Sequence, residues 1–128
     1  FADEEDIIDA LQRAHVYDEI KNYSNGLDTI IRANYSNMPS SIRYKLNIAR
    51  VFLKKSNIIL LDELPNSALN EDAGKAYQDI IEGARGKRTV FFISQRDDYL
   101  KRADRIIICN SGNRPQIVGA KEFLNKYS

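Results

Sequence analysis

The 128-residue sequence contains one cysteine, no tryptophan, three prolines and six glycines. The single cysteine, Cys109, excludes an intramolecular disulfide framework and fits a reducing compartment. No apolar run approaches the roughly 20 residues that a membrane-spanning helix needs, and no signal-peptide pattern opens the chain. We therefore expect one globular domain, or a large piece of one, that does not itself insert into a membrane.

The chain also lacks an excess of charge of either sign. It has 19 Lys and Arg residues against 18 Asp and Glu residues, which gives a net charge of +1. This balance does not favour a nucleic-acid partner or an anionic membrane surface. A basic stretch does lie between residues 42 and 55, and we interpret it as a solvated helix face rather than a nucleic-acid-binding surface. Its members are Arg43, Lys45, Arg50, Lys54 and Lys55.

Several catalytic arrangements are missing. The only histidine, His15, has no second histidine and no cysteine near it in the sequence with which to bind a metal, and no Ser-His-Asp arrangement can be identified. The segment 83–89 superficially resembles a phosphate-binding loop, but it lacks the hydroxyl after Lys87 and precedes a strand rather than following one. Because the chain begins with Phe1 and its only methionine is Met38, we expect it to be a processed product, a cut chain or part of something longer.

Hydrophobic periodicity predicts an α/β chain with two parts. Residues 1–55 are predicted to be helical, and residues 56–128 alternate strand and helix, which is typical of a mainly parallel sheet with right-handed crossovers. Helices are predicted at 3–17, 39–55, 70–83, 97–102 and 120–127, and strands at 57–62, 89–93, 105–109 and 116–118.

The most informative segment runs from Ile58 to Glu63, where four apolar residues lead directly into two carboxylates. A short continuous apolar run predicts a strand buried on both faces. Asp62 and Glu63 would then lie at the carboxyl end of that strand, where open α/β sheets bind ligands. Paired acids there suit a Mg²⁺-nucleotide site. The alternative, a buried strand that ends in solvated acids, stays open on this run alone.

The order of several segments makes the interpretation more specific. Together they resemble the ATP-binding cassette (ABC) ATPases, exporter-type, over nearly the whole chain. The resemblance implies a helical subdomain followed by the C-terminal half of a RecA-like P-loop NTPase core, with the phosphate-binding loop and the glutamine loop preceding Phe1. The segments are Ile7–Ala14, Asn25–Thr29, Leu46–Arg50, Phe52–Lys55, Ile58–Glu63, Ser67–Asn70, Thr89–Arg96, Ala103–Ile107 and Gly119–Leu124.

This resemblance implies roles for individual residues. Asp62 matches the acid that holds Mg²⁺ through water, and Glu63 matches the general base that orients the attacking water. Ser67 opens the loop that crosses a dimer interface, and Gln95 stands at the position of the switch histidine. The implied cofactors are ATP and Mg²⁺. The implied partners are a second nucleotide-binding domain and a transmembrane domain, at the cytoplasmic face of a membrane.

The sequence departs from the family pattern at phosphate-contacting positions. The signature LSGGQ corresponds to Met38-Pro39-Ser40-Ser41-Ile42, in which Ser40 and Ser41 replace both glycines and Ile42 replaces the amide. Gln95 cannot carry the charge of a histidine. One extra residue precedes Ser67. We therefore expect an ATPase weakened in catalysis and inactive as this isolated chain. The alternatives are tolerated drift in a working transporter, or a degenerate, non-hydrolysing cassette used for dimerisation or regulation.

Overall fold

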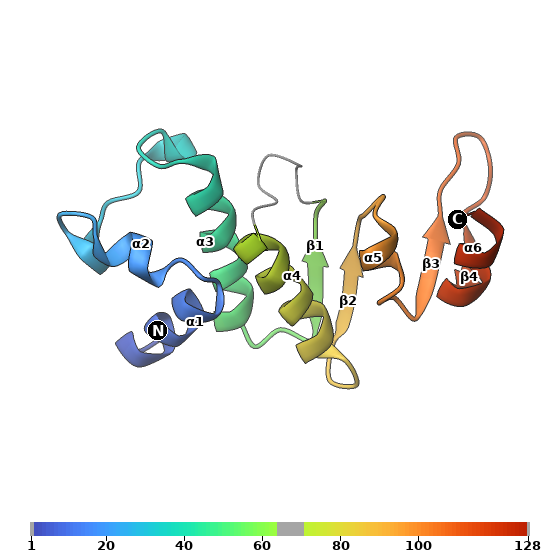
Figure 1. The fold of residues 1–128 in the computed structure, drawn as a ribbon, viewed down its shortest axis with the longest axis horizontal. Helices are drawn as coiled ribbons and strands as arrows, with labels where there is room; N and C mark the ends of the chain where they lie inside the picture. The colour runs from blue at the N-terminus through green and yellow to red at the C-terminus, as the bar shows by residue number, and fades with distance from the viewer. Residues whose placement is uncertain (1, 64–70, 128) are drawn as a thin grey trace. The chain divides into compact units, whose positions relative to one another are not determined.

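The computed structural model describes residues 2–63 and 71–127 (Figure 1). The chain divides into two compact units, Phe1–Phe91 and Phe92–Ser128. The boundary between residues 55 and 56 that the sequence suggested stays a prediction.

The first unit opens with helix α1 (Glu4–Arg13). The Asp3 carboxylate caps it by accepting the backbone N–H of Asp6 at 2.8 Å, and the acids of its first turn complement the helix dipole. The sequence predicted that this helix would reach residue 17, which is wrong. His15 adopts a left-handed φ of 54°, and this turn buries both Ala14 and Val16 completely before a second helix begins.

That second helix is α2 (Tyr17–Lys21), and two 3₁₀ turns follow it, η1 (Gly26–Asp28) and η2 (Ala33–Tyr35). Helix α3 (Ser40–Leu53) begins directly after Pro39, which occupies the N-cap position, where the missing N–H of proline has no cost. Its buried side chains are Ile42, Lys45, Ile48 and Ala49. They recur every three or four residues and form the face of α3 that packs against α1 and against helix α4 (Glu71–Ala84).

Strands β1 (Ile58–Leu61) and β2 (Thr89–Phe92) pair in the same direction, with α4 as the connection between them (Figure 1). This parallel pair confirms the predicted crossover. Burial along β1 alternates, however: Ile59 and Leu61 are buried, whereas Ile58 is 59% and Leu60 75% exposed. The expectation of burial on both faces is therefore wrong for the described residues, which cover only one face of this strand.

The second unit contains α5 (Asp97–Leu100), β3 (Arg105–Ile108), β4 (Gln116–Gly119) and α6 (Ala120–Tyr127). Strands β3 and β4 are antiparallel, unlike the first pair, and Ile106 lies opposite Val118. Their connection is short and turns at Gly112, whose φ is +79°, so a hairpin forms where a parallel pair would need a crossover. Helix α6 packs against both strands and has the bounds that the sequence predicted.

Candidate functional site

The predicted acid pair lies at the carboxyl end of β1. Asp62 and Glu63 directly follow Leu61, and both side chains are exposed. The backbone N–H of Glu63 donates to Oδ1 of Asp62 at 2.9 Å. On the other side of the same peptide group, the Tyr77 hydroxyl donates to the Asp62 carbonyl oxygen at 3.2 Å. Both ends of the peptide bond that joins the two acids are therefore hydrogen-bonded.

This geometry limits how a divalent cation could bind. Within residues 2–63 and 71–127, no group of three or more His, Cys, Asp or Glu side chains is placed to hold a metal ion. Mg²⁺ bound with a nucleotide needs only one or two carboxylates, because waters and phosphate oxygens supply the other ligands. Asp62 Oδ1 already accepts the Glu63 N–H, and its exposed carboxylate can still contact a hydrated cation. The residues present therefore fit Mg²⁺ that arrives with a nucleotide, and they do not form a cage for the free ion.

The residues at the signature position form the start of α3. The first N–H groups of an α-helix have no intrahelical acceptor, and here neither a side-chain cap nor an acidic residue occupies the first turn. An anion at this end would meet the positive end of the helix dipole. Ser40 is exposed and Ser41 half-buried, whereas Ile42 is only 6% exposed and packs into the core. Ile42 could therefore contribute only its backbone N–H to a ligand.

The basic stretch of α3 is not uniformly solvated, which corrects the sequence interpretation. Lys45 is only 2% exposed, and its Nζ lies 2.5 Å from Glu19 Oε1 on α2 and 3.7 Å from Asp72 Oδ2 on α4. A signal was present in the sequence, because Lys45 falls three residues after Ile42 and three before Ile48 on the apolar face. The other basic residues of the stretch are exposed or half-buried.

Arginine side chains of α3 also contact the η2 turn. Asn34 and Tyr35 both have left-handed φ values, of 61° and 53°, which are strained for residues other than glycine. Arg50 Nη1 donates to the Tyr35 hydroxyl at 2.8 Å, and the guanidinium groups of Arg43 and Arg50 each lie 5.9 Å from the Tyr35 ring centre. These contacts fix the turn that leads into Pro39 and the start of α3.

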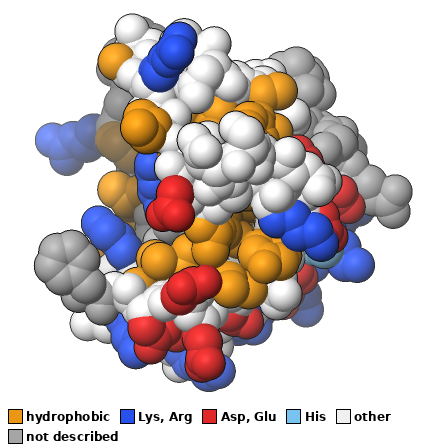
Figure 2. Space-filling model, turned by 90° about the vertical axis from the view of Figure 1, so that its left-hand side faces the viewer, with side chains coloured by type: hydrophobic (Ala, Val, Ile, Leu, Met, Phe, Trp, Pro, Cys, Tyr) orange, Lys and Arg blue, Asp and Glu red, His pale blue; other side chains and the backbone are white. Residues whose placement is uncertain are grey.

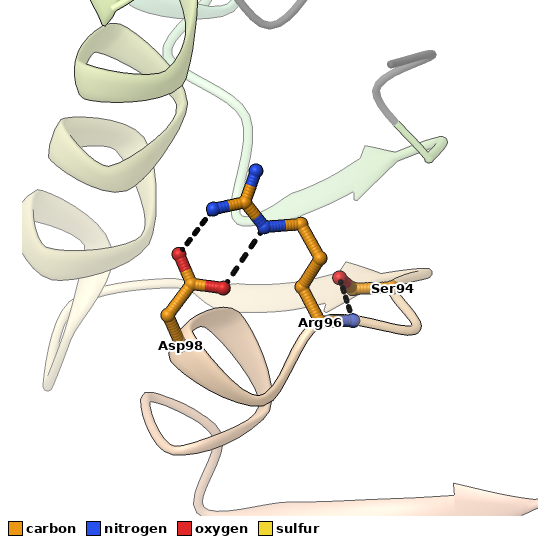
Figure 3. A network of polar contacts seen from close by, with 3 residues as sticks. All are labelled: Ser94, Arg96 and Asp98. Carbon is orange, nitrogen blue, oxygen red and sulfur yellow. Dashed lines mark hydrogen bonds and ion pairs between the residues drawn. The ribbon is translucent and has the colours of Figure 1, made fainter.

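Gln95 belongs to the second unit and is exposed. Its neighbours form a compact polar turn before α5 (Figure 3). The Ser94 hydroxyl accepts the backbone N–H of Arg96 at 3.1 Å, and the Arg96 guanidinium forms two hydrogen bonds to the Asp98 carboxylate, of 2.9 and 2.8 Å. The hydrogen bond from Arg96 lowers the pKa of Asp98 below its usual range. Gln95 therefore lies in a turn that the Ser94–Arg96 and Arg96–Asp98 hydrogen bonds stabilise.

Ser67 and the loop it opens lie outside the described residues.

On the side of the first unit that carries α1 and α2, apolar side chains lie at the surface among acidic and basic ones (Figure 2). The exposed large apolar residues in the segment between α2 and α3 are Leu27, Ile30 and Ile31. Among the described helices, none is both long and apolar enough to span a bilayer.

Comparison with known proteins finds relatives that match most of this chain. The chain is 36% identical over 131 residues to an ATP-dependent lipid A-core flippase of Mannheimia succiniciproducens, a match that covers 95% of the chain and 22% of the flippase. It is also 36% identical over 116 residues to the uncharacterized ABC transporter ATP-binding protein YwjA of Bacillus subtilis, covering 90% of the chain and 20% of that protein. No protein-family model matches the chain.

The fold agrees with these matches. The structure of a bacterial Atm1-family ABC exporter with ATP bound superimposes with a TM-score of 0.80 over 99% of this chain and 22% of the exporter chain, at 20% sequence identity. The chain is therefore a homologue of one segment of the ABC transporter proteins, as its sequence suggested. It spans about a fifth of the length of the curated relatives that it matches.

Proposed function

We propose that this chain is part of the ATP-binding domain of an ABC transporter, in which MgATP bound at an interface between two such domains drives transport through a transmembrane domain. The observation that carries this proposal is the exposed Asp62–Glu63 pair at the carboxyl end of β1. Two relatives support it because they match most of the chain, one named an ATP-dependent lipid A-core flippase and the other an ABC transporter ATP-binding protein.

In this proposal each acid has a separate task. Asp62 would hold the hydrated Mg²⁺ that accompanies ATP, and that cation would neutralise charge on the phosphates. Glu63 accepts a hydrogen bond from the attacking water and orients it toward the γ-phosphate. The N-terminal end of α3, at Ser40 and Ser41, provides backbone N–H groups to a phosphate bound by the partner domain.

Residues at the family's phosphate-contacting positions support the proposal that hydrolysis is weakened. Ser40 and Ser41 carry side chains where the family pattern has glycines, so the backbone approaches a phosphate less closely. The buried Ile42 side chain offers no hydrogen bond to a ligand. Gln95 can donate and accept hydrogen bonds but cannot become charged. These features also favour a second candidate function, a non-hydrolysing cassette that serves dimerisation or regulation.

The experiment that separates the two functions is ATP hydrolysis by the complete gene product that carries this chain. If the chain is part of a hydrolysing ATPase, Glu63→Gln should lower the turnover of ATP at least about 100-fold and leave ATP binding intact. The substitution removes the general base and keeps the contacts to the phosphates. If the chain is part of a non-hydrolysing cassette, the unmodified protein hydrolyses no ATP and Glu63→Gln changes nothing measurable.

A matched control uses a carboxylate away from the site. Glu82→Gln alters an exposed acid near the end of α4 and should leave turnover unchanged. The isolated 128-residue chain should neither hydrolyse ATP nor bind it tightly by calorimetry. Robust hydrolysis by the isolated chain would contradict the proposal that it supplies only part of the site.

A further inference from the structure

Helix α4 brings an unusual side chain to the end of β1. Its buried face consists mainly of small and aliphatic residues, and Tyr77 is the one aromatic residue among its buried side chains that the structure describes. The set is Ala73, Ala76, Tyr77, Ile80, Ile81 and Ala84. A phenylalanine ring would fill the same space, so packing alone does not require a hydroxyl. The hydroxyl reaches the Asp62 carbonyl oxygen at 3.2 Å.

The position of that carbonyl gives the contact its significance. It belongs to the peptide group between Asp62 and Glu63, so its orientation is tied to ψ of Asp62 and φ of Glu63, the torsions that relate the two side chains to each other. Tyr77 is only 3% exposed, and a buried hydroxyl that loses its partner is costly, which favours keeping the contact. The N–H of the same peptide group is held by Asp62 Oδ1 at 2.9 Å.

The helix that carries Tyr77 is itself anchored at its start. Asp72, in the first turn of α4, lies 3.7 Å from the buried Nζ of Lys45 on α3. Ala73 and Ala76 are completely buried on the same helix, which leaves α4 little freedom to slide. Tyr77 therefore extends from a fixed support to the peptide group between the two acids.

We propose that Tyr77 is a positioning residue, which fixes the Asp62–Glu63 peptide group and thereby the directions of both carboxylates. The hydrogen bond is part of the chain's own structure, whereas its catalytic consequence rests on the proposed ATPase function. Tyr77 acts through the backbone of Asp62 and needs no contact with nucleotide. Small errors in the placement of reacting groups are costly in rate, so loss of the hydroxyl should affect turnover more than binding.

The first test is spectroscopic and uses the 128-residue chain. Tyr77→Phe keeps the ring and removes only the hydroxyl, so the carbonyl ¹³C resonance of Asp62 and the amide ¹⁵N resonance of Glu63 should both move. Tyr44→Phe is the matched control, because it removes a hydroxyl from a half-buried tyrosine on α3 and should leave both resonances in place. Resonances of Asp62 and Glu63 that stay unchanged in Tyr77→Phe would overturn the proposal.

The second test is kinetic and uses the complete gene product at a temperature where the variants are folded. Tyr77→Phe should lower kcat about tenfold and leave KM for MgATP within about twofold. A merely structural role would lower Tm and leave kcat of the folded protein unchanged, and that result would overturn the positioning role. If the unmodified protein binds but does not hydrolyse ATP, the readout is the Mg²⁺ concentration that half-saturates ATP binding, which Tyr77→Phe should raise about threefold.

The two proposals fail in different ways. Shifted Asp62 and Glu63 resonances with no binding of ATP by the complete protein would contradict the ATP-binding function and leave the hydrogen bond established. Unchanged resonances together with loss of turnover in Glu63→Gln would support the ATPase function and refute the positioning role of Tyr77.

Discussion

The burial of Lys45 predicts that removal of its acidic partner, Glu19, destabilises the protein more than removal of the lysine itself. Its side chain is 3% exposed, whereas those of Glu19 and Asp72 are 40% and 55% exposed. Removal of the lysine leaves two acids that water can reach. Removal of Glu19 leaves a buried ammonium group with one weaker partner at 3.7 Å. The two substitutions therefore differ in whether an inadequately paired charge stays inside the protein.

The expected magnitudes follow from this asymmetry. Lys45→Met keeps most of the buried volume and removes the desolvated charge, so it should cost about 1 kcal/mol or less, since apolar replacements of buried ion pairs are often neutral. Glu19→Ala should cost about 2–3 kcal/mol, below the range for fully buried pairs because Asp72 and partial solvent access remain. The acid substitution should therefore be the more damaging by at least about 1 kcal/mol.

Urea unfolding at 25 °C, followed by far-UV circular dichroism, measures both free energies of unfolding. Tyrosine fluorescence serves as a second probe, because coincident transitions are needed before the values are compared. Asp18→Ala is the control on the same helix, because Asp18 pairs with the exposed Lys21 and its loss should matter far less. If Lys45→Met proved more destabilising than Glu19→Ala, the argument from charge burial would be refuted.

Two further predictions concern the end of α4 and the turn before α5. Gly86 has a φ of +71° and Gly83 lies within the helix, and both have open space around an added Cβ. Gly86→Ala should therefore lower the free energy of unfolding by about 1 kcal/mol and Gly83→Ala raise it by about 0.5 kcal/mol or more, as thermal unfolding would show. Because the hydrogen bond from Arg96 lowers the pKa of Asp98, this contact stabilises the fold above the ordinary carboxyl pKa and is lost as pH falls through the lowered value. Arg96→Ala should raise the pKa of Asp98 in a ¹³C-detected titration, and an unchanged pKa would contradict the assigned cause.

The elements that were predicted well are those whose local signals agree. Helix α6 has an apolar period over its whole length and follows a strand directly, and it forms from Ala120 to Tyr127 as predicted. Helix α3 begins one residue after the predicted Pro39, because proline is suited to a helix start. The acids Asp62 and Glu63 were placed at a strand end from the pattern alone, and β1 ends at Leu61.

The features that the sequence did not predict depend on contacts outside the local sequence. No glycine or proline marks the break at His15, where the left-handed turn serves the burial of Ala14 and Val16 on either side. The burial of Lys45 depends on Glu19, 26 residues before it, and on Asp72 of a later helix, so its sequence neighbours only suggest it. The Tyr77 contact depends on the position of α4 along β1, which periodicity does not specify.

The two strand pairs have different consequences for the order in which the chain folds. Strands β3 and β4 are near neighbours in sequence, joined by one turn at Gly112, and such hairpins form within about 1–10 μs. Strand β2 joins β1 only across α4, with the Thr89 N–H bonded to the Asn57 carbonyl at 2.9 Å. That contact closes a long loop, whose entropic cost must be met before the pairing stabilises the chain. We therefore expect the acids at the end of β1 to acquire their fixed geometry late, after the hairpin near the C-terminus has formed.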